Sequence, residues 1–240
     1  MTELVRLQGV SKSYGALKVI DDLSVTIEQG EALGVLGPNG AGKSTMFNLI
    51  TGDVRPDQGR VFLGGQDITS MAASERCRKG VGRSYQVPHP FGGMTVYENL
   101  LVGATFGARM PEREASEHCV AVLERTGLIG KANQLAGSLT LLDRKRLELA
   151  KALATKPKVL LLDEIAGGLT EHEAAVLVDT IKSISKEGVT IVWIEHVVHA
   201  LLAVVNRLIV INFGALLKEG LPEEVMAARE VREVYMGMEA

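Results

Sequence analysis

Nearly uninterrupted apolar runs occur at three places along the chain, and each predicts a buried β-strand. They cover residues 32–36 and 159–162 and most of the strand predicted at 189–195. Strands that are apolar on both faces are typical of parallel sheets covered by helices on either side. Helical patterns separate these runs, so we predict an α/β protein.

A different pattern near the start predicts antiparallel strands. Between residues 4 and 27, apolar and polar positions alternate in places, with Leu23, Val25 and Ile27 on one face. The turn at residues 28–30 leads into the first apolar run, so a small antiparallel β layer precedes it. Further short strands are predicted at residues 59–64, 81–86 and, as the last strand of the chain, 208–213.

The middle of the chain carries helical signals and no strand signals. Thr95 and Glu98 form a capping box, and apolar residues recur at helical spacing over residues 112–126 and 140–155. We therefore predict a helical lobe inserted into the α/β core. The predicted division of the single domain, 1–240, is a core of residues 1–94 and 156–240 and a lobe of residues 95–155.

Two further segments complete the pattern. Residues 87–93 hold two prolines and two glycines, which excludes a helix and predicts a flexible or exposed loop. Thr170 and Glu173 form a second capping box for a helix over residues 171–187. Shorter helical patterns are predicted at residues 70–79, 198–205 and from Pro222 onward.

Composition narrows the function classes. The chain has 240 residues, a formal net charge of -3 and only 4% aromatic residues, which argues against a nucleic-acid partner. The basic run at residues 144–146 is expected to be a solvated helix face. No membrane-spanning helix, signal peptide or cysteine framework is expected, since polar residues and a glycine break the most apolar long stretch. We expect a soluble, cytosolic protein with any membrane role through partners.

One stretch has a specific chemical meaning. It matches the phosphate-binding pattern G-x-x-x-x-G-K-[ST], directly after the first apolar run and before an apolar helical pattern. Glycines let successive backbone N–H groups surround an anion at a helix N-terminus. Lys43 would contact the β- and γ-phosphates and Ser44 would bind Mg²⁺. The predicted binding residues are Gly37, Pro38, Asn39, Gly40, Ala41, Gly42, Lys43, Ser44 and Thr45.

Polar residues at three strand ends complete a candidate hydrolytic site. In a nucleotidase with such a loop, Asp163 would hold Mg²⁺ and Glu164 would polarise the attacking water. Gln86 ends one predicted strand, and His196 follows the strand after Glu164 and would contact the γ-phosphate. Taken singly, His196 could be structural and Glu164 a surface acid, but their order and placement together favour function.

The whole chain resembles the ATP-binding subunits of ATP-binding cassette (ABC) transporters, which implies ATP and Mg²⁺ as cofactors. The resemblance is strongest to importers of branched-chain and related amino acids, in residues 82–91, 95–100 and 166–170. It implies that Tyr14 stacks on adenine, although a surface packing role is the alternative. It also implies that Gln86 contacts Mg²⁺ and water, Glu164 is the catalytic base and His196 senses the γ-phosphate.

The resemblance also implies partners. They are a second ABC ATPase subunit, transmembrane permease subunits and, indirectly, an extracytoplasmic binding protein, with this chain at the cytoplasmic face of the membrane. The family's fold is an α/β phosphate-loop core with a mixed sheet, an antiparallel β layer and the inserted helical lobe. The rival function is a soluble ABC ATPase without a membrane partner. A GTP-binding protein is disfavoured because residues 155–158 lack the aspartate of a guanine-reading motif.

The family signature Leu-Ser-Gly-Gly-Gln stands here as Leu139-Thr140-Leu141-Leu142-Asp143. In the family this segment faces the ATP of a partner subunit. If its second glycine needs a positive φ, Leu142 would add about 1–2 kcal/mol of strain. We therefore expect an unequal pair with a paralogous subunit and one weaker composite site. The alternative is a reshaped helix start in which Thr140 or Asp143 compensates.

Overall fold

The computed structural model describes residues 2–236, which form two β-sheets and a group of helices. The six-stranded sheet has the order β10-β9-β3-β8-β7-β6. Its pairs are parallel except β9 with β10, so the sheet is mixed. These strands are β3 (Ala32–Leu36), β6 (Val81–Ser84), β7 (Val159–Asp163), β8 (Thr190–Ile194), β9 (Arg207–Asn212) and β10 (Ala215–Gly220).

The predicted antiparallel layer is also present. Its order is β2-β1-β4-β5, and Leu7 pairs with Val25 in the centre of the layer. Val25 is buried while its neighbour Ser24 is exposed, as the alternation predicted. These strands are β1 (Glu3–Tyr14), β2 (Leu17–Glu28), β4 (Gln58–Leu63) and β5 (Gln66–Asp67).

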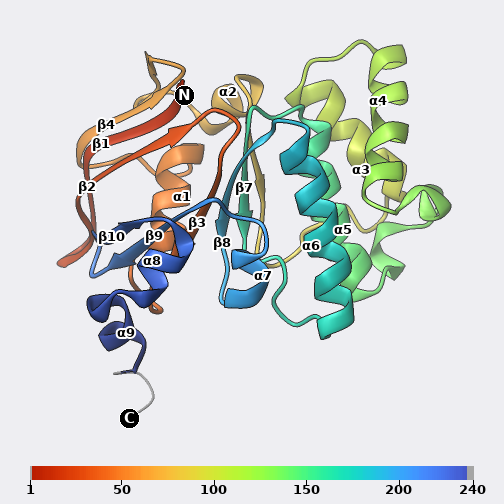
Figure 1. Ribbon diagram of the computed structural model, residues 1–240. Coiled ribbons are helices and arrows are strands. Elements are labelled where there is room, and N and C mark those ends of the chain that lie inside the picture. Colours follow the sequence, from red (N-terminus) through yellow and green to blue (C-terminus); the bar gives the residue numbers. More distant parts are fainter. Residues whose placement is uncertain (1, 237–240) are drawn as a thin grey trace.

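Helix α1 (Lys43–Thr51) fills the space between the two sheets, and the remaining large helices cover the other face of the six-stranded sheet (Figure 1). Strand β7 shows why its residues are all apolar. Val159 and Leu161 pack in the core beside α1, whereas Leu160 and Leu162 pack in the core on the helical side. The structure thus confirms the α/β prediction and the mixed sheet.

The predicted helices of the middle segment are present, and α3, α4 and α5 lie together at one end of the molecule (Figure 1). Their bounds are α3 (Val96–Val102), followed by a π-helical turn (Gly103–Gly107), α4 (Glu112–Arg125) and α5 (Leu141–Ala154). Helix α5 packs against α3 and α4 but also against β6 and β7. Because α5 packs on both the helical lobe and the sheet, the division of the domain at residues 95–155 stays a prediction.

The other helices are short except one. They are α2 (Ala73–Arg78), α6 (Glu171–Lys186), α7 (Val198–Leu202), α8 (Pro222–Ala227) and α9 (Arg229–Met236). Glu173 and Thr170 form the predicted capping box of α6. Within residues 2–236, no helix combines the length and apolar character needed to cross a membrane.

The prediction that the strand at 208–213 is the last one was wrong. Strand β10 follows β9 directly through a two-residue turn in which Phe213 and Gly214 have φ of 46° and 79°. Such left-handed turns match the twist of a β-hairpin. The Gly214 amide donates to the carbonyl oxygen of Ala41 at 3.0 Å, so this turn braces the phosphate loop.

Candidate nucleotide-binding site

The predicted phosphate loop lies between the end of β3 and the start of α1. Gly42, the residue before α1, has φ of 104°, which L-residues rarely adopt. A Cβ atom there would lie 2.6 Å from Ile20 Cδ1 and 2.7 Å from the carbonyl oxygen of Val19. Glycine is therefore required at this position both by backbone conformation and by space.

Lys43 is the first residue of α1, and its side chain folds back over the loop. Its Nζ donates to the carbonyl oxygens of Gly37 at 2.7 Å and Pro38 at 2.9 Å. Burial lowers the pKa of this ammonium, although the carboxylates of Glu164 and Asp163 act in the opposite direction. The loop and Lys43 thus present positive groups to one space.

That space is a hollow of about 170 Å³ that the phosphate loop shares with one acid. Its lining consists of Val19, residues 39–45 and Glu164. The helix start supplies N–H groups without intrahelical partners, which fits a phosphate group. Tyr14 lies at the end of β1, is 46% exposed and is not among these lining residues, so its role toward adenine stays a prediction.

Asp163 is the last residue of β7 and is almost fully buried. Its Oδ2 accepts a hydrogen bond of 2.6 Å from Arg83 Nη2. Within the described part of the chain its Oδ1 has no hydrogen-bond partner. A buried carboxylate oxygen without a donor fits a cation, so Asp163 and the Ser44 hydroxyl are suited to Mg²⁺.

The described residues contain no cluster of three or more His, Cys, Asp or Glu side chains that could hold a metal by themselves. Mg²⁺ commonly binds through one or two protein groups together with substrate phosphates. The donor set here, one hydroxyl and one carboxylate beside a phosphate loop, suits a cation that arrives with the nucleotide.

Glu164 contacts two other predicted catalytic residues directly. Glu164 Oε1 lies 2.8 Å from His196 Nε2, and Glu164 Oε2 accepts a hydrogen bond of 2.6 Å from Gln86 Nε2. They come together because β6, β7 and β8 are parallel neighbours, whose carboxyl ends share one edge of the sheet. Gln86 itself lies two residues beyond β6, not within the strand as predicted, so its amide can turn toward Glu164.

The prediction of a solvated face at residues 144–146 was wrong for Lys145. Its side chain is buried, and its Nζ donates to the carbonyl oxygens of Gln86 at 2.8 Å and Glu164 at 3.2 Å. Helical spacing places this residue on the side of α5 that faces the sheet. A lysine can occupy such a position because its apolar stem packs in the core while its terminal ammonium finds polar partners. The run of basic residues alone does not reveal this.

Two other polar residues of the site were not predicted. Arg83 binds Asp163, Asn48 and Asp53, with its Nη1 2.6 Å from Asn48 Oδ1. Glu195 is buried and accepts hydrogen bonds from the backbone N–H groups of His196 and Ala166, which fixes the segment that carries His196. Glu195 directly precedes His196 and Arg83 lies three residues before Gln86, and this closeness in sequence was the signal available.

The altered signature begins α5 in a regular helical conformation. Thr140 is the N-cap: its Oγ1 accepts from the Asp143 amide and donates to Asp143 Oδ2 at 2.8 Å. Leu142 is not among the residues with positive φ, so the strain expected there does not exist. Thr140 and Asp143 form an ordinary helix start together, and the alternative that one of them compensates for the lost glycine stays a prediction.

A phosphate loop between strand and helix, with a buried aspartate and a glutamate at the same sheet edge, defines a phosphate-loop nucleotide hydrolase. The family is narrower than that class. Residues 20–167 match the ABC transporter family, which is more than half of the chain. The chain therefore belongs to the ATP-binding subunits of ABC transporters: it binds and hydrolyses ATP and works with transmembrane partner subunits.

Relatives of known name fall into more than one transport class. The chain is 34% identical to the branched-chain amino acid transport protein BraF of Pseudomonas aeruginosa, over 98% of each chain. It is 36% identical to the lipopolysaccharide export protein LptB of Acidithiobacillus ferridurans, over 99% of this chain and 98% of that one. A nucleotide-free ATP-binding cassette of solved structure matches with a TM-score of 0.89, 30% identity, and coverage of 98% and 99%.

Proposed function

We propose that this subunit hydrolyses ATP with Glu164 as the base and thereby energises the import of branched-chain or related amino acids. The observation that carries the catalytic part is the contact of Glu164 with Gln86 and His196 beside the phosphate hollow. The solute class rests on the segments at residues 82–91, 95–100 and 166–170 and on relatives such as BraF. Relatives such as LptB leave lipopolysaccharide export as the competing transport class.

The residues divide the work of hydrolysis. The loop amides and Lys43 bind the β- and γ-phosphates, while Ser44 and Asp163 hold Mg²⁺, which neutralises developing charge on the phosphates when bound. Glu164 accepts a proton from the attacking water, and Gln86 and His196 orient the reactants. Each oxygen of Glu164 is paired with one of these two side chains and keeps a second lone pair that can accept a hydrogen bond from the attacking water.

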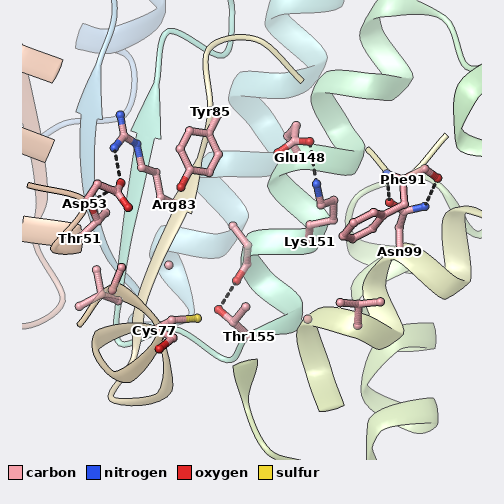
Figure 2. Close-up of a pocket in the computed structure, with 17 residues that line it drawn as sticks. Thr51, Asp53, Cys77, Arg83, Tyr85, Phe91, Asn99, Glu148, Lys151 and Thr155 are labelled. Atoms are coloured by element: carbon pink, nitrogen blue, oxygen red, sulfur yellow. Dashed lines mark hydrogen bonds and ion pairs between the residues drawn. The ribbon is translucent and has the colours of Figure 1, made fainter. Parts of the chain in front are cut away.

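The membrane partner is assigned to a groove next to the Gln86 loop. This docking groove, of about 330 Å³, lies between β6 and α5 (Figure 2). Arg83 and Tyr85 line one side, and Phe91 and Lys151 line the other. Exposed aromatic rings beside a polar wall suit a protein segment, so a permease segment seated here would touch the loop that carries Gln86. On this proposal the subunit lies at the cytoplasmic face of the membrane.

The ATPase partner is proposed to be a paralogous subunit. The first two amides of α5 precede its first internal hydrogen bond and are the donors that would face a partner's ATP. Leucine side chains at both positions replace the glycines that permit close approach, and Leu141 is 47% exposed. The two leucine side chains therefore weaken ATP binding at one composite site of the pair, because they block close approach and shield the amides from the phosphates. Backbone strain plays no part.

The catalytic assignment is tested by Glu164→Gln in the assembled transporter. The variant should keep ATP affinity because the amide preserves shape, and it should lose turnover by about 10²–10⁴-fold because it cannot accept a proton. ATP affinity is measured with a fluorescent nucleotide and turnover by phosphate release. Full activity of Glu164→Gln would remove Glu164 from this role.

The transport class is tested by partners and solutes. The chain is expressed with candidate permeases and its ATPase rate is measured in liposomes with binding proteins that carry leucine, an amide, urea or an aromatic acid. Stimulation by one of these supports amino-acid or related import. A subunit that stays soluble with every permease would support the soluble ABC ATPase instead, and stimulation by lipopolysaccharide would support export.

Leu142→Gly tests the unequal pair. In the assembled transporter, the glycine should raise the ATPase rate because it opens the amide at the start of α5 to the partner's ATP. Phosphate release at saturating ATP is the measurement. An unchanged or lower rate would contradict the idea that this position weakens a composite site.

A further inference from the structure

A buried lysine lies at the junction between α5 and the hydrolytic residues. Lys145 is in the second turn of α5 and is only 4% exposed. Across residues 2–236 no ion pair joins its ammonium to a carboxylate, and its hydrogen bonds go to the backbone carbonyls of Gln86 and Glu164. A buried cation that donates hydrogen bonds to two backbone carbonyl groups fixes the position of the main chain that carries them.

The two carbonyls belong to residues whose side chains also meet. Gln86 Nε2 donates to Glu164 Oε2 at 2.6 Å, while Lys145 holds the main chain of both residues. Gln86 lies two residues beyond β6 and Glu164 one residue beyond β7, where the last sheet hydrogen bond of Glu164 is the one that its amide donates to the carbonyl oxygen of Ile194 at 2.8 Å. Glu164 moreover has φ of 46°, a conformation that a non-glycine residue keeps only where its surroundings hold it.

The surroundings of Lys145 act on both its charge and its position. Burial lowers the pKa of its ammonium, and the carboxylates of Glu195, Glu164 and Asp163 act in the opposite direction. Helix α5 packs on both β6 and β7, the two strands from which Gln86 and Glu164 continue. A shift of α5 would therefore move the ammonium relative to both carbonyls together.

We propose that Lys145 is a positioning residue that sets the Gln86–Glu164 contact and links it to the position of α5. Helix α5 begins at the segment proposed to face the partner's ATP. A displacement of that segment would therefore move Lys145 and, with it, the catalytic base Glu164 of this subunit's own site. The proposal rests on the roles proposed above for Glu164 and Gln86.

The test compares Lys145→Met and Lys145→Arg in the full chain assembled with its partner subunits. Methionine keeps the stem but removes the donors, so kcat should fall by about 10²-fold, the scale of a misplaced catalytic group, while KM and the Kd of a fluorescent ATP analogue stay within about threefold. Arginine carries several donors and should restore most of the loss in kcat. Lys182→Met, on the exposed side of α6, is the matched control and should match the native protein.

A double-mutant cycle with Gln86→Ala shows whether Lys145 acts through the contact. If it does, Lys145→Met lowers kcat much less in the Gln86→Ala background than in the native one. Native kcat for Lys145→Met, additive losses, or a raised KM with unchanged kcat would each overturn the proposal. If Lys145→Met does not assemble, Lys145→Gln takes its place, and native kcat for that variant would overturn it equally.

Failure of this inference is distinguishable from failure of the proposed function. Loss of turnover in Glu164→Gln with native kcat in Lys145→Met removes Lys145 alone. Full activity in Glu164→Gln removes the catalytic assignment on which the inference rests.

Discussion

Replacement of Arg83 by methionine would leave the buried Asp163 carboxylate without its cation. The Arg83 side chain is 8% exposed and that of Asp163 is 6% exposed, so water cannot substitute for the lost guanidinium. Removing one partner of a buried ion pair lowers the free energy of unfolding by about 3–5 kcal/mol. That is a large part of the total free energy of unfolding of most domains, about 5–15 kcal/mol. For a domain of this size the unfolding midpoint should fall by roughly 6–20 °C.

The assay follows urea unfolding through Trp193, the single tryptophan, which is fully buried in the native protein. Arg113→Met is the matched control: that arginine is 93% exposed and forms only a helical surface pair with Glu117, worth about 0.5 kcal/mol or less. A loss below about 1 kcal/mol in Arg83→Met would refute the reasoning, because it would mean that Asp163 is adequately solvated or paired without Arg83.

Two further predictions concern stability. Thr140→Ala removes the N-cap of α5 and should lower the free energy of unfolding by about 1 kcal/mol in the same urea assay, and an unchanged midpoint would contradict the capping role. Burial lowers the pKa of Lys43 from its ordinary value of 10.5, so the unfolded chain binds more protons just below pH 10.5 and this lysine makes stability rise with pH there. Lys43→Met should flatten that part of the curve of urea midpoint against pH, and an unchanged slope would argue against the burial effect.

Much of the fold was predictable because burial imposes simple patterns. The apolar strand at 159–162 lies between two cores, and the alternating strand at 23–27 has one solvated face. The meeting of Gln86, Glu164 and His196 was also predictable in outline, because parallel strands place their carboxyl ends on one edge. The distances between these side chains and their direct pairing could be learned only from the structure.

The failures have specific physical causes. Strand β10 contains Lys218 and Glu219 and pairs along only one side, so it lacks the apolar pattern of a central strand. Lys145 was misjudged because a charge run says nothing about which member faces the sheet. The strain expected at Leu142 assumed a positive φ, whereas Thr140 starts an ordinary helix in which leucine fits.

The hairpin turn at Phe213 and Gly214 has a consequence for nucleotide binding. The Gly214 amide holds the Ala41 carbonyl, and the Gly214 carbonyl accepts from the Asp21 amide at 2.9 Å, so β2 and β9 clamp the phosphate loop through one residue. A loop braced in this way loses little conformational entropy when an anion enters. The hairpin of β9 and β10 is remote in sequence from the phosphate loop. It nevertheless orders part of that loop before the nucleotide binds and so lowers the entropic cost of binding.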